Sequence, residues 1–154
     1  MAQEIERKFL VTGDEWRSRA TGHRFRQGYL STVKERTVRV RVAGDAATLT
    51  IKGITVGATR TEYEYAVPLA DAQAMLDDLC ERPIIEKTRH VVREGGLTWE
   101  VDEFEGANAG LIVAEVELND AGRNIALPSW VGDEVTDDPR YFNSNLIARP
   151  YTGW

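Results

Sequence analysis

The residues that could do chemistry in this chain are pairs of charged side chains spaced two positions apart. The first stretch reads E-I-E-R-K-F-L-V from Glu4 to Val11, and Glu4, Glu6 and Lys8 occupy alternate positions within it. Successive side chains of a β-strand point to opposite faces, so these three charges would share one face. The same spacing recurs along the chain at Arg39/Arg41, Glu62/Glu64, Lys87/Arg89, Glu100/Asp102 and Glu115/Glu117, and Lys52 stands alone.

Like charges that share one strand face repel each other, so their repetition predicts a ligand that compensates them. Carboxylate pairs suit Mg²⁺ or Mn²⁺, which prefer oxygen ligands. Arg-x-Arg and Lys-x-Arg pairs suit a polyanion such as a chain of phosphates. The charged face has more acidic than basic residues, so a polyphosphate would enter together with one or two divalent cations. With two cations, one could orient the phosphates while the other activates water.

The elements that must position these pairs are short segments with alternating hydrophobicity. Turn signals such as Gly95-Gly96 separate the segments, and this regular spacing is typical of an all-β barrel or sandwich. We expect strands over residues 4–11, 25–31, 37–42, 47–52, 61–67, 84–93, 97–104 and 111–118.

The composition of the charged face indicates which way it points. A half-solvated sheet would also place polar residues on one face, but such a face normally mixes charged and uncharged residues. Here it is almost entirely Arg, Lys, Glu and Asp, while the other face carries residues such as Val40, Tyr63, Tyr65 and Trp99. Alternate residues of a closed barrel point inward, and a larger barrel can hold a ligand cavity. We therefore expect a charged lumen and an apolar outer face packed against the helices and the tail.

Few segments have a helical pattern. Ala72, Met75, Leu76 and Leu79 follow the i, i+3, i+4, i+7 spacing, which predicts an amphipathic helix over residues 71–80. Shorter helices are expected over residues 14–20 and 144–148. There is no internal repeat or linker, so we expect a single domain over residues 1–154.

The composition restricts the compartment and the partners. A single cysteine, Cys80, excludes an internal disulfide framework and is typical of a reducing compartment. A net charge of −6 argues against general affinity for nucleic acid or anionic membranes. No apolar run has the layout of a signal peptide or the length of a membrane span, so we expect a cytoplasmic protein.

The ordered set of charged pairs resembles the CYTH superfamily, the triphosphate tunnel metalloenzymes. E-I-E-R-K-F-L-V resembles the E-x-E-x-K signature of that family, and the resemblance extends to Q-G-Y-L around Tyr29 and to the tail R-Y-F-N-S-N-L from Arg140 to Leu146. It implies a mainly β (α+β) fold, an eight-stranded antiparallel β-barrel that forms a tunnel with a few helices outside. It also implies a Mg²⁺- or Mn²⁺-dependent enzyme, and the short chain is most like the small bacterial inorganic triphosphatases.

The resemblance also implies roles for individual residues. The expected catalytic residues are Tyr29, Lys8 and Lys87, with the Lys8 ammonium helping the Tyr29 phenol to accept a proton. The expected metal ligands are Glu4, Glu6, Glu115 and Glu117. The expected triphosphate clamp comprises Lys8, Arg39, Arg41, Lys52, Lys87 and Arg89. Residues expected to bind a second metal or to orient the basic side chains are Glu62, Glu64 and Asp102, and for Glu100 we favour the orienting role.

Several alternative functions remain open from the sequence. The CYTH superfamily includes class IV adenylyl cyclases and thiamine triphosphatases, and a nucleoside triphosphatase would use the same tunnel. A non-catalytic polyphosphate-binding module would keep the basic clamp. A lipocalin-like carrier would require the apolar face to line the lumen. The expected partner is a small triphosphate substrate, and the chain is expected to be a monomer or a homodimer.

Overall fold

The computed structural model describes residues 3–120 and 122–154 of the 154-residue chain. Its strands are β1 (Gln3–Val11), β2 (Thr21–Ser31), β3 (Thr37–Ala43), β4 (Ala46–Lys52), β5 (Thr59–Ala66), β6 (Ile85–Glu94), β7 (Leu97–Phe104), β8 (Ile112–Glu117) and β9 (Val131–Glu134). Its α-helices are α1 (Leu69–Asp78) and α2 (Asn145–Ala148), and its 3₁₀ turns are η1 (Glu15–Arg19), η2 (Gly106–Asn108), η3 (Pro139–Tyr141) and η4 (Tyr151–Gly153).

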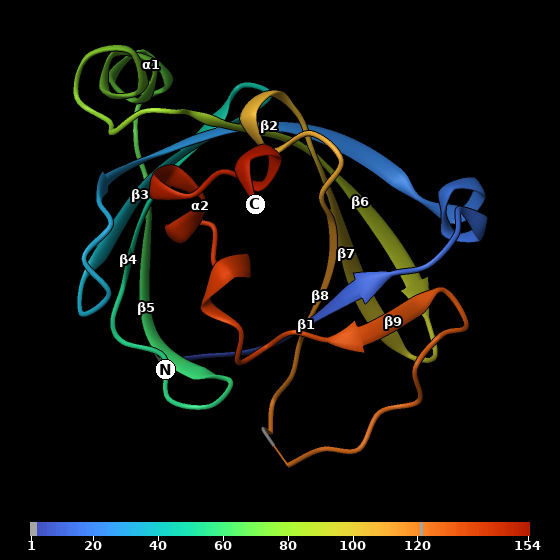
Figure 1. Ribbon diagram of the computed structural model, residues 1–154. Coiled ribbons are helices and arrows are strands. Elements are labelled where there is room, and N and C mark those ends of the chain that lie inside the picture. The colour runs from blue at the N-terminus through green and yellow to red at the C-terminus, as the bar shows by residue number, and fades with distance from the viewer. Residues whose placement is uncertain (1–2, 121) are drawn as a thin grey trace.

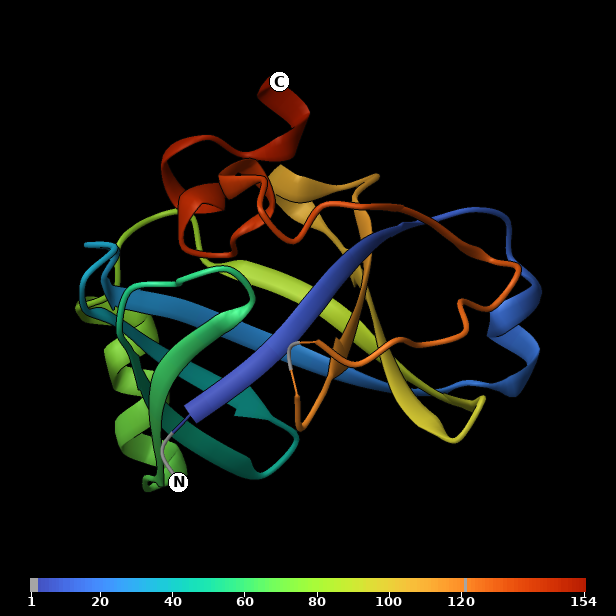
Figure 2. The same ribbon diagram turned by 90° about the horizontal axis from the view of Figure 1, so that it is seen from below.

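Strands β1 to β8 form a closed antiparallel barrel, which confirms the expected fold class. The hydrogen-bonded order runs β5-β4-β3-β2-β6-β7-β8-β1, and a further pairing between β5 and β1 closes the ring. That closure is short, because β1 pairs with β5 only from Gln3 to Ile5. Figure 1 looks into the barrel, and Figure 2 shows it from below, with the C-terminal tail lying over one end.

A ninth strand, β9, lies outside this ring and was not predicted. It pairs with β1 at Phe9 and Val11, beyond the part of β1 that pairs with β5. Its sequence, V-G-D-E, is too short to show an alternating pattern, so its pairing depends on the edge that β1 leaves free. β9 therefore covers the outer edge of β1 without lining the lumen.

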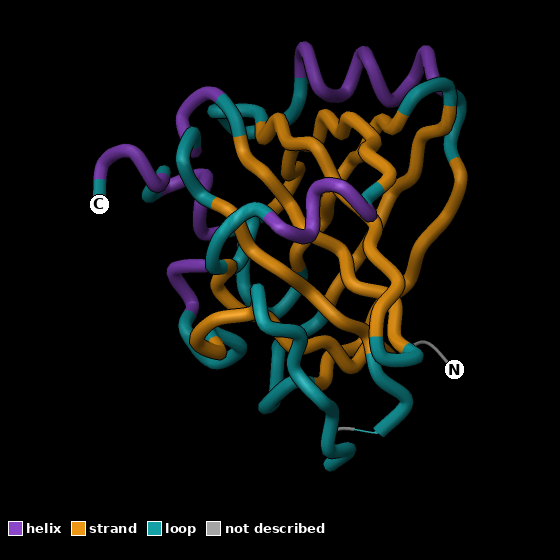
Figure 3. Tube along the Cα trace, turned by 90° about the vertical axis from the view of Figure 1, so that its right-hand side faces the viewer, coloured by secondary structure: helices purple, strands orange, loops and turns teal. Residues whose placement is uncertain are grey.

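The helices differ slightly from the expected segments. Helix α1 spans Leu69–Asp78, so it begins and ends two residues earlier than the expected 71–80. The segment expected to be helical over residues 14–20 is the single 3₁₀ turn η1, and α2 lies within the expected 144–148. In Figure 3, α1 lies against the outside of the strands, away from the C-terminus.

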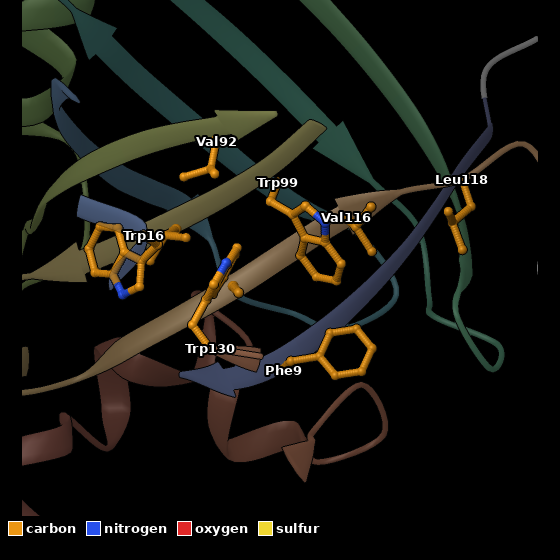
Figure 4. Packing of buried hydrophobic residues seen from close by; sticks show 9 residues of the cluster. Phe9, Trp16, Val92, Trp99, Val116, Leu118 and Trp130 are labelled. Atoms are coloured by element: carbon orange, nitrogen blue, oxygen red, sulfur yellow. The ribbon is translucent and has the colours of Figure 1, made fainter. Parts of the chain in front are cut away.

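Apolar side chains pack on the outer face of the barrel. One cluster joins Phe9 on β1, Trp99 on β7 and Trp130 before β9, with the ring centroids of Trp99 and Trp130 5.6 Å apart. Figure 4 shows these rings packed against β1, β7 and β8. A second cluster packs α1 on β3 and β4 through Leu76 and Val40. The strand faces opposite the charges thus supply the core.

The expectation of a covered outer face is wrong at β5. Tyr63 is 47% exposed and Tyr65 is 56% exposed, although they belong to the apolar set opposite Glu62 and Glu64. Helix α1 packs on β3 and β4, so it leaves this part of β5 uncovered.

Turn chemistry explains how the strands connect. The hairpin between β6 and β7 turns at Gly95 and Gly96, whose φ angles are 64° and 73°. Two consecutive positive φ angles match a two-residue hairpin turn that suits glycine, as predicted.

Within residues 3–120 and 122–154, no helix has both the length and the apolar character needed to span a bilayer.

Candidate active site

The barrel encloses a polar cavity of about 250 Å³. Every predicted site residue except Asp102 lines it, as does Glu100. These side chains come from β1, β2, β3, β4, β5, β6, β7 and β8, and the tail adds Phe142, Asn143 and Ser144 at one end. The charged strand faces therefore point inward, and the lipocalin-like alternative, which needs an apolar lumen, does not fit.

Strand register places opposite charges next to each other in the lumen. Lys8 is paired with Glu115, Lys52 with Glu62, and Arg89 with Asp102 in neighbouring antiparallel strands. Directly opposite residues on one face of a sheet have their Cβ atoms about 5 Å apart, which allows ion pairing. The like charges within each strand are thus partly neutralised by the adjacent strand.

The most deeply buried charges surround Asp102. Its side chain is fully buried and accepts hydrogen bonds from Lys87 Nζ at 2.7 Å and from Arg89 Nε and Nη2 at 2.8 and 2.9 Å. Burial alone would raise the pKa of Asp102, but Arg89 and Lys87 hold it well below its usual range. Asp102 therefore stays ionised and fixes both basic side chains without reaching the cavity itself.

The pKa of Lys87 shifts downward in spite of this partner. Burial lowers it to about 7, and the nearby Arg89 and Arg41 contribute in the same direction. The pKa of Arg41 also falls, to about 9, because its guanidinium is buried and lies close to Arg39 and Arg89. This end of the cavity is therefore short of negative charge.

A chain of hydrogen bonds connects the tail to this basic end. Arg41 Nε donates to Gln27 Oε1 at 3.0 Å, and Gln27 Nε2 donates to Asn143 Oδ1 at 2.8 Å. Asn143 Oδ1 also accepts from Lys87 Nζ at 3.0 Å. Gln27 is fully buried, so its side chain stays in this hydrogen-bonded position between Arg41 and Asn143.

Lys8 lies at the same end of the cavity as the tail. Its Nζ is 3.6 Å from a Glu115 oxygen, 3.4 Å from the Tyr141 carbonyl oxygen and 5.5 Å from the Phe142 ring centroid. Burial opposes its charge, but Glu115 and Glu6 outweigh burial and raise its pKa. Tyr29 is buried and lines the same cavity, and among the described residues no hydrogen bond joins it to Lys8.

The carboxylates of the predicted metal set have unlike environments. Burial raises the pKa of Glu4, although Lys52 Nζ lies 3.0 Å away. Burial and the neighbouring Glu115 raise the pKa of Glu6 well above its usual range, and Glu6 forms no ion pair within the described chain. Burial also raises the pKa of Glu117. By contrast, Lys8 and Arg89 outweigh burial and hold the pKa of Glu115 at about 2.

These carboxylates fit a divalent cation by their chemistry. The raised pKa values of Glu4 and Glu6 mean that a nearby positive charge would stabilise their ionised forms, and carboxylate oxygens are ligands for Mg²⁺ and Mn²⁺. Among residues 3–120 and 122–154, no three acidic, His or Cys side chains are already arranged as a metal cage. Lys52 and Lys8 hold Glu4 and Glu115 instead, so a cation would have to displace these ion pairs.

The remaining acidic residues face basic partners. Glu62 lies 3.4 Å from Lys52, Glu100 lies 3.3 Å from Arg89, and Glu64 lies 3.9 Å from Arg39. At these ion-pair distances the three glutamates can orient the basic side chains that they face.

Sequence reasoning missed two cavity residues, Arg60 and Asn143, and also the fully buried Gln27. Arg60 lines the cavity and donates from Nε and Nη2 to the Gly53 carbonyl oxygen at 3.1 and 3.0 Å. The sequence did contain a pattern that identifies Arg60, because Arg60, Glu62 and Glu64 are spaced i, i+2, i+4 and so share one face of β5. Gln27 likewise precedes Tyr29 by two positions on β2, whereas no sequence pattern places Asn143 in the lumen. Arg60 gives the lining as many basic as acidic side chains, where the sequence predicted an acidic excess.

Comparison with known proteins shows a family that covers nearly the whole chain. The family model described as CYTH domain matches residues 2–151. An inorganic triphosphatase from Acetivibrio thermocellus is 51% identical over 151 residues, which cover 98% of this chain and 97% of that protein. An inorganic triphosphatase from Nitrosomonas europaea is 37% identical over 148 residues, which cover 93% of this chain and 95% of that protein.

A solved structure shows the same architecture. The crystal structure of the inorganic triphosphatase NE1496 superposes with a TM-score of 0.67 at 34% sequence identity. The superposition covers 96% of this chain and 95% of that one. The overall fold is therefore shared with a solved inorganic triphosphatase.

Proposed function

The chain belongs to the CYTH domain family, and from that premise we propose that it is an inorganic triphosphatase that cleaves triphosphate to diphosphate and phosphate. The observation that carries this proposal is the shortage of negative charge at the tail end of the cavity. Lys87 and Arg41 lie there with lowered pKa values, and within the described chain the Arg41 guanidinium has no carboxylate partner while Asp102 is shared between Lys87 and Arg89. Buried cations of this kind favour a polyanionic ligand.

The size of the cavity supports a bare polyphosphate as the substrate. Pockets for drug-sized ligands and cofactors usually enclose about 300–1,000 Å³ and are largely apolar. This cavity holds about 250 Å³ and is lined by charged side chains. Inorganic triphosphate suits such a cavity better than a nucleotide or thiamine ester, whose organic part would need an apolar surface.

We propose that Glu4, Glu6, Glu115 and Glu117 hold one or two divalent cations, Mg²⁺ or Mn²⁺. When bound, the cation would neutralise phosphate charge and lower the pKa of a water molecule. Glu6 is the strongest candidate of the four, because it is a half-buried, cavity-lining carboxylate with a raised pKa and without an ion-pair partner in the described chain.

The basic residues would bind the phosphates and stabilise the charge that develops on the leaving diphosphate. These residues are Lys8, Arg39, Arg41, Lys52, Lys87 and Arg89. Catalysis of phosphoryl transfer is mostly positioning and electrostatic stabilisation, which a rigid charged barrel supplies. Asp102 would hold Lys87 and Arg89 in place, and Glu62, Glu64 and Glu100 would orient Lys52, Arg39 and Arg89.

Proton transfer would fall to residues at the tail end. Lys87, with a pKa of about 7, can exchange a proton near neutral pH. Tyr29 lines the cavity near Lys8 and, as a phenolate that the Lys8 ammonium would stabilise, would accept a proton from the attacking water. The attack itself would proceed in line with the bond to the leaving diphosphate.

The proposal is tested by incubating the protein with triphosphate, with ATP and with diphosphate in Mg²⁺, and by identifying all products. We expect triphosphate to give diphosphate and phosphate, with ATP far slower and diphosphate unchanged. ATP converted to diphosphate and a cyclic nucleotide would indicate a cyclase instead. No cleavage of any substrate, with triphosphate still protecting the protein against heat, would indicate a polyphosphate-binding module.

Three further features remain predictions from the sequence. We propose that residues 1–154 act as a single domain, that the protein is a monomer or a homodimer, and that it works in the cytoplasm.

A further inference from the structure

The hydrogen bonds of Gln27 and Asn143 can have only one direction. Arg41 carries donors and no acceptor, so its contact at 3.0 Å requires an oxygen on Gln27. Gln27 Oε1 is therefore the atom that faces Arg41, and its Nε2 faces Asn143 at 2.8 Å. Because Gln27 Nε2 is a donor, Asn143 must present its oxygen to it.

Lys87 gives the same orientation for Asn143 independently. In its protonated form the Lys87 ammonium has three donors and no acceptor, and it lies 3.0 Å from the same Asn143 oxygen. Lys87 is 1% exposed and also held by Asp102, so it cannot turn away to relieve a wrong contact. Two fixed donors, from β2 and from β6, thus determine which end of the Asn143 amide is oxygen.

This orientation leaves the amide nitrogen of Asn143 without a partner. Within residues 3–120 and 122–154, Asn143 Nδ2 donates no hydrogen bond, and both hydrogen bonds of the side chain are accepted by its oxygen. Asn143 lines the cavity and is hydrogen-bonded there to Lys87. A neutral group with two free N–H donors is therefore held at the positively charged end of a cavity for polyanions.

We propose that Asn143 is a substrate-binding residue, whose Nδ2 donates a hydrogen bond to a phosphoryl oxygen next to Lys87. The identity of the ligand rests on the proposed function, whereas the orientation of the amide does not. A donor whose position is fixed before the substrate arrives needs no reorganisation when charge develops on the phosphate. By this route the C-terminal tail contributes directly to the site that it closes.

The competing role for Asn143 is to position Lys87 through its oxygen only. Asn143→Asp separates the two roles, because a carboxylate keeps an acceptor for Gln27 and Lys87 but removes the donor and adds a negative charge. We expect kcat/KM for triphosphate to fall on the order of 100-fold or more in Asn143→Asp, at least as far as in Asn143→Ala. A residue that only positions Lys87 would leave Asn143→Asp well above Asn143→Ala, because the carboxylate still accepts from Lys87, with a loss no larger than the added charge causes in the control below.

Asn145→Asp is the matched control. Asn145 belongs to the same tail, donates from Nδ2 to the Pro139 carbonyl oxygen at 2.8 Å, and does not line the cavity. The control adds the same charge near the site and should stay within about threefold of the wild type. Equal losses in both aspartate variants would overturn the proposal, because they would mean that charge on the tail is the cause.

A measurement on the wild-type protein avoids any loss of folding in the variants. The side-chain amide protons of Asn143 are followed by ¹⁵N NMR while diphosphate is added in Mg²⁺, with the resonance identified by its absence from Asn143→Ala. We expect these protons to shift downfield and exchange more slowly on binding, while those of Asn145 do not. Diphosphate that binds without moving the Asn143 signal would overturn the inference. If the wild type neither binds diphosphate nor cleaves triphosphate, the proposed function fails instead.

Discussion

The basic side chains of the cavity fall into two kinds. Lys8, Lys52, Arg39, Lys87 and Arg89 each have a carboxylate within 4.0 Å. Among the described residues Arg41 and Arg60 line the cavity without such a partner. The first kind is held by the protein, and the second kind still has its charge available for a ligand.

A substitution of Asp102 measures how much its ion pairs with Lys87 and Arg89 contribute to the free energy of unfolding. Its pKa is depressed in the folded state, so it contributes stability above the unfolded pKa of about 3.9 and loses that contribution as the pH falls below it. Asp102→Asn leaves Lys87 and Arg89 buried without their anion, which we expect to cost about 3–5 kcal/mol at neutral pH. Urea unfolding of both proteins over a range of pH checks this.

The pH dependence of these unfolding free energies can also contradict the prediction. The stability difference between wild type and Asp102→Asn should shrink as the pH approaches about 3. A difference that stays constant over this range would show that the ionised carboxylate of Asp102 is not its source.

Arg60 tests the second kind of basic residue. Because its guanidinium has no carboxylate partner in the described chain, we expect it to bind the substrate directly. Arg60→Gln should raise KM for triphosphate about tenfold while kcat changes by less than about threefold, since one charged hydrogen bond is lost. Steady-state kinetics measure both constants.

Arg24→Gln is the control for Arg60→Gln. Arg24 also lies on a barrel strand, but it pairs with Glu86 and Glu105 on the exposed outer face. Its loss should leave both constants unchanged, and equal effects of the two substitutions would argue against a role for Arg60 in binding.

At the scale of elements, β2 shows how one short motif serves two faces. In Q-G-Y-L, Gln27 and Tyr29 point to the cavity side, where Gln27 bonds Arg41 and Asn143. Gly28 points outward, and a Cβ atom there would lie 2.8 Å from Ile84 Cδ1 and 2.9 Å from Cys80 Cβ. Glycine is required at Gly28 because the segment after α1 packs directly on the strand.

Gly28→Ala should therefore destabilise the protein. The added methyl overpacks the contact with Ile84 and Cys80, and we expect a loss of about 1–3 kcal/mol in the free energy of unfolding. Gly22→Ala on the same strand is the control, since its Cβ would meet its nearest neighbours at 3.4 Å. The control should change stability by less than about 0.5 kcal/mol. Similar losses in both variants would refute the close-packing argument.

The sequence predicted strands where the two faces differ in chemistry. β3, with alternating Arg39, Val40 and Arg41, has a charged lumen and a buried outer face, and its pattern was clear. The first residues of β2, from Thr21 to Arg24, are exposed and lack such a contrast, so the predicted strand began four residues late, at Phe25. Hydrophobic periodicity reflects burial, so it gives no signal where a strand is exposed and is defined only by its backbone hydrogen bonds.

For the whole molecule, the balance of charge in the lumen has a thermodynamic consequence. As many acidic as basic side chains line the cavity, so free triphosphate gains no net attraction from formal charge. A complex of triphosphate with a divalent cation carries less charge and brings a partner for the carboxylates. Binding of substrate and of metal should therefore be coupled.

We expect diphosphate and Mg²⁺ together to raise the melting temperature, and either alone to raise it much less. At 100-fold excess over Kd the gain is about 2.7 kcal/mol, or roughly 5–10 °C for a chain of this size. Differential scanning fluorimetry with Mg²⁺ and with EDTA measures it. Full protection by diphosphate in EDTA would contradict the coupling.

The closed barrel and the inward-facing charges were predictable because each strand repeats one alternation and the lumen must hold polar residues. The place of Asn143 in the cavity was not predictable, because it depends on how the tail folds back over the barrel. No local sequence pattern specifies its contact with Lys87. Arg60 was within reach of the same register argument that identified Glu62 and Glu64.

The central claim is that the charged face of the barrel interior does the chemistry, and two adjacent residues of β1 test it most directly. Lys8 points into the cavity, whereas Arg7 points outward and pairs with Glu134 at 2.8 Å. We would measure phosphate release from triphosphate in Mg²⁺ for Lys8→Ala and Arg7→Ala. The expected result is a loss of about 100-fold or more for Lys8→Ala and less than about threefold for Arg7→Ala. Near-normal activity in Lys8→Ala, or equal losses in both variants, would contradict the claim.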